Sequence, residues 1–315
     1  FFHRDRQWEN VGVNVRMCPL FEEEVLQEDE DTELVIDSHG IKCLRMKRSS
    51  SIPRFIEWPV KTREDFGRMR ERFDPHSPAR YPLYWEEKVR MWQERDYPLG
   101  IHAGSFYGEL REWMGIENLS VAFYDDPAWV HEMLDFLADH YVACMERALS
   151  DVQLDYAAFW EDMAYNKASL ISPAMWRAFL TEPYRKVTSV LREAGVDIIV
   201  VDSDGTMMEL TPCWLEAGVN VMFPMEARCN DPLALREQFG RDLLIIGAVD
   251  KFALMDGGAQ VSKEVMRKVR TLIRQGGYIP TVDHRIPPGV PLENYLCCLE
   301  LIDQIAGEAC TEPPA

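Results

Sequence analysis

Short apolar runs recur along the chain from about residue 97 onward, and a longer segment with helical periodicity follows each of them. The runs occupy 98–104, 156–162, 197–205, 218–226, 242–250 and 277–284. Asp126-Pro127 and Ser172-Pro173 open two of the intervening helices, which are expected to extend to about residues 149 and 193. Continuous apolar strands that alternate with helices predict an α/β fold in which helices cover a parallel sheet. Six such units fit either an open doubly wound sheet or an eight-stranded barrel whose first strands lie in the N-terminal third.

The first 96 residues follow a different pattern. The acidic run FEEEVLQEDED (21–31) is expected to be the solvated face of a helix. Ser38-His39-Gly40 separates two apolar segments, so a β-hairpin is expected near 33–47. Thr62 is expected to cap a charged helix. We therefore expect one domain over 1–315, in which an N-terminal elaboration (1–96) precedes a core of βα units (97–305).

The net charge of the chain excludes some classes of binding partner. The sequence has 34 basic and 53 acidic residues, for a net charge of −19. Such a surface repels phosphate backbones and anionic membranes, so neither nucleic acid nor a membrane is an expected partner. No apolar run approaches the roughly 18 residues that a membrane-spanning helix requires.

The eight cysteines are scattered through the 315 residues without a CxxC pair. Reduced thiols are the simpler interpretation of this spacing. The N-terminal stretch FFHRDRQWENVG also lacks the apolar core of a signal peptide. We therefore expect the protein in the cytoplasm.

Polar and ionisable residues gather at the C-terminal ends of the six apolar runs. They are His102, Glu161, Asp162, Asp202, Asp204, Glu226, Asp250, Asp283 and His284. In a (β/α)8 barrel these strand ends form one rim around the barrel axis, where such enzymes carry their chemistry. The pattern therefore predicts a site at this rim.

The run DIIVVDSDG (197–205) shows this arrangement most plainly. Side chains two residues apart on a strand face the same way, so Asp202 and Asp204 are expected to converge, with Gly205 allowing a sharp exit from the strand. Paired carboxylates with a histidine from a neighbouring strand suit a divalent cation. The alternative is that Asp202 caps the following helix or pairs with an arginine.

Other residues at the rim also have two interpretations. His284 precedes a proline-rich loop, which favours a place in the site over that of a hydrogen-bonded core histidine. Glu161 stands among aromatic residues, where burial would raise its pKa unless a cation compensates. Asp250 is either catalytic or the cap of the next helix. His102 precedes a bend of small residues that would let a ligand approach the backbone.

Three segments resemble the uroporphyrinogen decarboxylase superfamily. They are GGYIPTVDHRIPPGVPLENY (276–295), GIHAGSFYGELREWMG (100–115) and WEDMAY (160–165). The resemblance covers roughly 97–305 and implies a (β/α)8 TIM barrel, which the N-terminal helical and hairpin elaboration would precede. The superfamily includes decarboxylases that act without a cofactor and zinc methyltransferases of corrinoid-dependent systems.

The resemblance favours the methyltransferases. The decarboxylases carry an arginine-rich motif of the type MRQAGRY, which FFHRDRQWENVGVNVRM (1–17) does not match. The methyltransferases that activate thiols bind zinc through a His-x-Cys-Gly motif and a later cysteine. Asp202-Ser203-Asp204-Gly205 stands at the first of these positions and His284 at the second. Carboxylates and imidazole in place of thiolates favour a Lewis-acid zinc that polarises a methyl donor.

The resemblance thus implies transfer of a methyl group from a small methylated substrate, a methoxyarene or a methylated amine, to a corrinoid protein. Metal ligands are expected among Asp202, Asp204, Glu226 and His284, and catalytic roles for Glu161, His102 and Asp250. Aromatic side chains that could line the substrate pocket, or belong to the core, are Phe106, Trp113, Trp160, Tyr165 and Phe223. A homodimer is one expected assembly. A metal-free lyase and a subunit that only docks a corrinoid protein are the alternatives.

Overall fold

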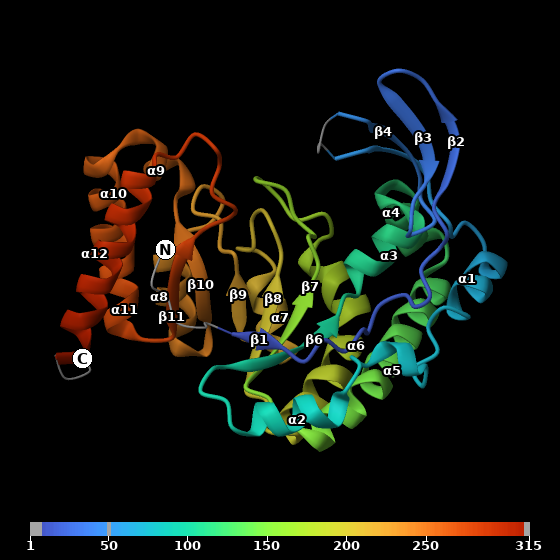
Figure 1. The fold of residues 1–315 in the computed structure, drawn as a ribbon, viewed down its shortest axis with the longest axis horizontal. Helices are drawn as coiled ribbons and strands as arrows, with labels where there is room; N and C mark the ends of the chain where they lie inside the picture. The colour runs from blue at the N-terminus through green and yellow to red at the C-terminus, as the bar shows by residue number, and fades with distance from the viewer. Residues whose placement is uncertain (1–7, 49–51, 312–315) are drawn as a thin grey trace. The chain divides into compact units, whose positions relative to one another are not determined.

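The computed structural model describes residues 8–48 and 52–311. Its chain divides into two units (Figure 1). The first contains the residues up to Glu161 together with Glu182–Asp197, and the second contains Asp162–Thr181 and the residues from Ile198 onward. The single domain expected over 1–315 stays a prediction, and each unit is described by itself below.

A four-stranded antiparallel sheet lies near the N-terminus of the first unit. Its order is β2 (Glu24–Glu28), β3 (Thr32–Ile36), β4 (Lys42–Met46) and β5 (Arg54–Glu57). Figure 1 shows β2, β3 and β4 as a blue sheet that stands apart from β6 and β7 of the same unit. The hairpin predicted near 33–47 is confirmed as β3 and β4, in which Val35 lies opposite Cys43 and both are buried.

The prediction of a helix for the acidic run 21–31 is wrong. Residues Glu24–Glu28 form β2 and pair with β3. All five side chains of β2 are exposed, so their charges remain in water while the backbone completes the sheet. Pairing with a neighbouring strand therefore decides the local structure here, and a pattern of charges alone does not reveal it.

The first unit also holds three parallel strands, β1 (Glu9–Asn10), β6 (Leu99–Gly104) and β7 (Tyr156–Trp160), with β6 between the other two. A strand in the N-terminal third is what the barrel alternative required. The helices of this unit are α1 (Arg63–Arg70), α2 (Trp85–Gln93), α3 (Tyr107–Met114), α4 (Ile116–Asp125) and α5 (Pro127–Asp151), with a 3₁₀ turn at Pro78–Arg80. Helix α6 (Pro173–Glu193) begins in the second unit and ends in the first.

The predicted helix starts are confirmed. Thr62 caps α1 through a capping box, in which its side chain accepts from the N–H of Asp65 and the Asp65 carboxylate accepts from the N–H of Thr62. Asp126 caps α5, with Pro127 as its first helical residue. These caps satisfy N–H groups that a helix leaves without internal partners.

The second unit is built on four parallel strands, β8 (Ile198–Asp202), β9 (Val221–Phe223), β10 (Leu244–Val249) and β11 (Tyr278–Val282), in that order. Its other helices are α7 (Thr211–Glu216), α8 (Pro232–Phe239), α9 (Lys251–Asp256), α10 (Gly258–Glu264), α11 (Arg270–Gln275) and α12 (Leu292–Thr311). A 3₁₀ turn at Gly240–Asp242 follows α8, and a π-helical turn at Val265–Val269 joins α10 to α11.

The carboxyl ends of β8 to β11 lie at one edge of the second unit, because the four strands are parallel. Apolar side chains from β10, α9, α10, α12 and the π-helical turn pack into a core that includes Val249, Leu254, Val261, Val265 and Ile302. This packing fixes the strands that carry the polar residues. No helix in the described ranges combines the length and apolarity needed to cross a membrane.

Candidate functional site

Three aspartates form a cluster at the carboxyl edge of the second unit. Carboxylate oxygens of Asp162, Asp202 and Asp204 lie within 4.8 Å of one another. Asp202 is the last residue of β8, and Asp204 follows two residues later. Asp162 has a positive φ of 47°, a conformation that few residues other than glycine adopt. Strained backbone of this kind often accompanies functional sites, where the surrounding structure holds it in place.

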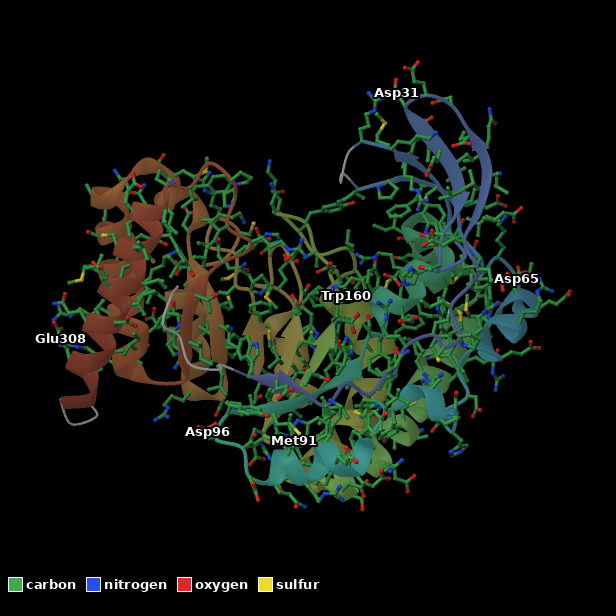
Figure 2. The ribbon with its side chains drawn as sticks, in the orientation of Figure 1. Asp31, Asp65, Met91, Asp96, Trp160 and Glu308 are labelled. Carbon is green, nitrogen blue, oxygen red and sulfur yellow. The ribbon has the colours of Figure 1, made fainter. Side chains whose placement is uncertain are left out.

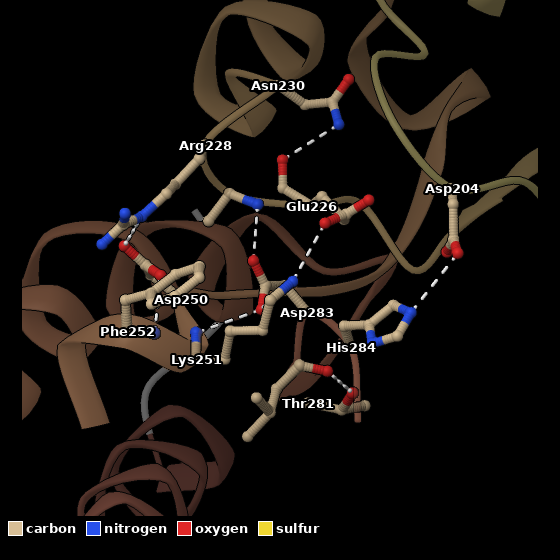
Figure 3. A network of polar contacts seen from close by, with 12 residues as sticks. Asp204, Glu226, Arg228, Asn230, Asp250, Lys251, Phe252, Thr281, Asp283 and His284 are labelled. Atoms are coloured by element: carbon tan, nitrogen blue, oxygen red, sulfur yellow. Dashed lines mark hydrogen bonds and ion pairs between the residues drawn. The ribbon is translucent and has the colours of Figure 1, made fainter. Parts of the chain in front are cut away.

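His284 adds a nitrogen donor to this cluster. It follows β11, and its Nε2 lies 3.3 Å from Oδ2 of Asp204 (Figure 3). The side chains of His284 and Asp204 are 37% and 44% exposed, so solvent or a ligand reaches both. Three carboxylates and one imidazole make a set of hard and borderline donors that suits a divalent cation.

The electrostatics of the cluster also favour a cation. Burial, together with repulsion from Asp162 and Asp204, raises the pKa of Asp202 to about 7. Burial and the charge of Asp162 likewise raise the pKa of Asp204, although His284 opposes the shift. Crowded carboxylates that resist losing a proton are stabilised in their charged form when a positive ion joins them.

The loop after β8 is held by a continuous series of hydrogen bonds. Each N–H from Ser203 to Met207 donates to an oxygen of a different segment, at 2.7–3.1 Å. The acceptors, in order, are Phe223 O, Asp162 Oδ1, Glu226 Oε1, Tyr165 O and Asn230 Oδ1. Gly205 has a φ of 84°, and a Cβ there would lie 2.6 Å from Tyr165 O. The end of β8 and this loop therefore hold the Asp202 and Asp204 carboxylates on a fixed backbone.

Glu226, predicted as a metal ligand, lies after β9 and is engaged elsewhere. Its Oε1 accepts from the N–H of Gly205 at 2.8 Å, and its Oε2 lies 2.9 Å from Nζ of Lys251. Burial raises the pKa of Glu226, but the Gly205 N–H and the Lys251 ammonium outweigh burial and lower it overall. Glu226 is thus an ionised neighbour of the cluster, and its role as a ligand stays a prediction.

Asp250 and Asp283 accept hydrogen bonds from backbone N–H groups at the same carboxyl edge of the second unit (Figure 3). Asp250 caps α9 by accepting from the N–H of Phe252 at 2.8 Å, which is the capping role considered as an alternative to catalysis. Asp283 is buried and accepts from the N–H groups of Ala227 at 2.8 Å and Lys251 at 3.1 Å. Both carboxylates fix loops around the site.

Glu161 belongs to the first unit, where it holds a helix start. The residue is fully buried, and its carboxylate accepts from the N–H groups of Phe106 at 2.8 Å and Gly108 at 2.9 Å, and from the Tyr184 hydroxyl. Burial raises its pKa although these donors oppose the shift. These contacts anchor the start of α3, and its predicted catalytic role stays a prediction.

His102, on β6, is neutral at physiological pH. Burial and the nearby charge of Arg16 lower its pKa to about 4. Its Nδ1 accepts from the N–H of Gly104 at 2.9 Å, so the proton resides on Nε2. His102 therefore offers an N–H donor, and its predicted part in catalysis remains to be tested.

The predicted aromatic residues differ in their surroundings. Phe106 and Trp113 are buried in the core of the first unit, as the plainer alternative proposed. Trp160, labelled in Figure 2, is half-buried at the end of β7, and the guanidinium carbons of Arg16 and Arg111 lie 5.2 and 5.4 Å from its ring centroid. In the second unit, Tyr165 is 63% exposed and Phe223 is half-buried.

Some residues of the site had no predicted role. Asp162 was expected at the rim but not among the metal ligands, because its approach to Asp202 and Asp204 involves a left-handed backbone that sequence does not reveal. Lys251 and Asn230 act through contacts with segments more than 20 residues away. No local pattern signals such contacts.

Parallel strands covered by helices, with ionisable side chains at the strand ends, define an enzyme-like α/β fold of the barrel type. The sequence profile described as Uroporphyrinogen decarboxylase (URO-D) matches residues 40–305. This match covers most of the chain, so the protein belongs to the uroporphyrinogen decarboxylase family. Its fold is the (β/α)8 TIM barrel of that family, with the sheet β2–β5 and nearby helices as an N-terminal elaboration, as predicted.

The chain is also similar to a solved structure, the methyltransferase from Methanosarcina mazei. The TM-score is 0.58 with 16% sequence identity, and the match covers 85% of this chain and 77% of that one. At 16% identity, the structural similarity establishes a shared fold alone. A comparison with curated proteins finds no match.

Proposed function

We propose that the protein is a methyltransferase that moves a methyl group from a small methylated substrate to a corrinoid carried by a partner protein. A zinc ion bound by Asp162, Asp202, Asp204 and His284 would serve the reaction. The observation that carries the proposal is this group of three carboxylates and one imidazole at the strand ends of a uroporphyrinogen decarboxylase family member. The likeness to a methyltransferase structure supports it.

The donor chemistry fits a divalent ion. Carboxylate oxygens bind zinc, magnesium and manganese, whereas an imidazole nitrogen favours zinc over magnesium. Burial and mutual repulsion raise the pKa of Asp202 and of Asp204, so a cation bound in the cluster would stabilise both carboxylates. Hydrogen bonds also fix the 203–207 loop, which carries Asp204 and follows directly on Asp202 at the end of β8, so little reorganisation is needed to bind a cation.

When bound, the zinc ion supplies a Lewis acid that weakens the bond between the methyl group and its oxygen, nitrogen or sulfur. The protein's own residues have separate tasks. With a pKa of about 7, Asp202 is partly protonated near neutral pH, and a cation held by the cluster would favour its ionised form. His284 keeps its ring beside Asp204, and the five N–H bonds of the 203–207 loop hold the carboxylates in place.

A methyl-transfer assay tests this function. The zinc-loaded protein is incubated with cobalamin reduced to cobalt(I), or with its native corrinoid partner, and with a panel of methoxyarenes and methylated amines. Formation of methylcobalamin, followed by absorbance, is the expected result. The His284→Ala variant should lose this activity, whereas Asp256→Asn, which changes an exposed aspartate on α9, should keep it.

A parallel assay with uroporphyrinogen addresses the lyase alternative. The proposal expects no decarboxylation, because the net charge of −19 disfavours a polycarboxylate substrate. The proposal fails if no donor in the panel methylates the native partner while uroporphyrinogen is consumed.

A further inference from the structure

Glu226 and Lys251 form an ion pair next to the aspartate cluster. The two charged groups are 2.9 Å apart, and both side chains are largely buried, with exposures of 20% and 15%. Lys251 remains charged, because Glu226, Asp283 and Asp204 raise its pKa even though burial alone would lower it. The pair thus adds no net charge to the site.

Both oxygens of the Glu226 carboxylate make polar contacts. One oxygen accepts the N–H of Gly205 and the other faces the Lys251 ammonium. Each oxygen keeps a second lone pair, but the two contacts set the direction of the carboxylate, and the Lys251 ammonium offsets its charge. Glu226 is therefore a weaker donor to a metal ion than a carboxylate that makes no such contacts.

The contact with Gly205 fixes the backbone beside Asp204. Glu226 accepts the Gly205 N–H, while the Asn230 side chain donates to the Gly205 carbonyl oxygen at 3.0 Å. Asn230 also donates to the Glu226 carbonyl oxygen at 3.0 Å. Both polar groups of Gly205 are therefore held from the segment after β9, and the direction of the preceding Asp204 side chain is set with them.

Asp283 joins the segments that bear the ion pair. Its carboxylate accepts from the N–H of Ala227, the residue after Glu226, and from the N–H of Lys251. The Lys251 Nζ also lies 3.9 Å from Asp283 Oδ1. Figure 3 shows Asp283 between the two segments, with Glu226 and Lys251 directed toward each other.

We propose that Glu226 is a positioning residue that aims Asp204 at the metal through the Gly205 N–H, and that Lys251 keeps Glu226 in this role and away from the ion. The inference rests on the metal site of the proposed function. It differs from the sequence prediction, in which Glu226 binds the metal directly.

Two double variants of equal charge separate these roles. Glu226→Gln with Lys251→Met keeps a side-chain oxygen for the Gly205 N–H, whereas Glu226→Leu with Lys251→Met removes it. Zinc affinity is measured by competition with a chromophoric chelator. We expect the Gln variant to stay within about 3-fold of the wild type and the Leu variant to bind about 10–100-fold more weakly, as for other residues that orient metal ligands.

Equal, large losses of zinc affinity in both double variants would overturn the proposal, because an amide is a poor substitute for a ligating carboxylate. Wild-type affinity in the Leu variant would overturn it as well, since no positioning would then be needed.

Hydrogen exchange of the metal-free protein gives a second measurement, which does not depend on zinc. The Gly205 amide should exchange faster in the Leu variant and at the wild-type rate in the Gln variant. Unchanged exchange in both variants would contradict positioning by Glu226. If the wild type binds no zinc at all, the proposed function fails while the exchange result still decides the structural part of the inference.

Discussion

Asp202 is the residue whose surroundings most strongly favour the binding of a cation. It ends β8, is half-buried, and shares a small volume with the carboxylates of Asp162 and Asp204. Its pKa of about 7 lies well above the value of about 3.9 for an aspartate in an unfolded chain. Such a shift links protonation, metal binding and folding.

Asp202→Asn should change the pH dependence of the metal-free protein. Because the folded pKa is raised, the stability that Asp202 contributes is full below about pH 4 and is lost as pH rises through about 7. The wild type should therefore lose more unfolding free energy between pH 5 and 8 than the Asn variant does. Denaturant titrations in the presence of a chelator measure this difference, and parallel curves for the two proteins would speak against the shift.

Asp162→Asn tests a residue that was absent from the predicted ligand set. Its carboxylate oxygen lies within 4.8 Å of oxygens of Asp202 and Asp204, so it should act as a ligand of the same ion. We expect zinc affinity to fall at least about 10-fold, in a chelator competition experiment. The Asp256→Asn variant serves as the control, and equal affinity in both variants would remove Asp162 from the site.

At the scale of elements, the 203–207 loop determines how well the site is organised. Gly205→Ala would require a left-handed backbone at an alanine and would bring its Cβ to 2.6 Å from Tyr165 O and 2.8 Å from Ala164 O. A loss of about 2–4 kcal/mol in unfolding free energy is expected from conformational strain and overpacking. Gly258→Ala, in α10 with open space around the glycine, should cost little in comparison.

Thermal or denaturant unfolding of both alanine variants provides the measurement. Equal stability of the two variants would show that the loop relaxes around the added methyl group. The zinc affinity of Gly205→Ala should fall together with its stability, because the loop carries Asp204.

The pattern of apolar and polar residues predicted the strands and helices whose apolar side chains are buried. All six apolar runs are strands, and the helices opened by Asp126-Pro127 and Ser172-Pro173 begin as expected. The acidic strand β2 was not predicted, because its five exposed side chains show no apolar face and only pairing with β3 makes it a strand.

The candidate site was predictable in part for a similar reason. The period of a strand predicted that Asp202 and Asp204 converge, and they do, although β8 ends at Asp202 and Asp204 lies in the loop that follows. The resemblance of the 276–295 segment pointed to His284. The inclusion of Asp162 and the engagement of Glu226 by Lys251 depend on backbone conformation and on contacts distant in sequence. Those features arise only when the chain is folded.

At the scale of the whole molecule, the family and the net charge indicate the kind of chemistry, but they do not identify the substrate. Membership in the uroporphyrinogen decarboxylase family indicates barrel chemistry at the strand ends. A charge of −19 disfavours polyanionic partners, and under the proposed function it is compatible with either a neutral methoxyarene or a methylated ammonium as the methyl donor. The donor panel of the methyl-transfer assay separates these two substrate classes.

X-ray absorption at the zinc edge of the zinc-loaded wild type gives the most direct test of the proposed metal centre. Burial and the nearby charge of Glu226 raise the pKa of the Cys229 thiol, and sulfur would be a different kind of zinc ligand from those proposed. The proposed site requires only oxygen and nitrogen neighbours at about 2.0–2.2 Å, including the outer-shell signature of one imidazole that disappears in His284→Ala. A sulfur neighbour at about 2.3 Å, or an imidazole signal that persists in the variant, would contradict a metal centre built from Asp162, Asp202, Asp204 and His284.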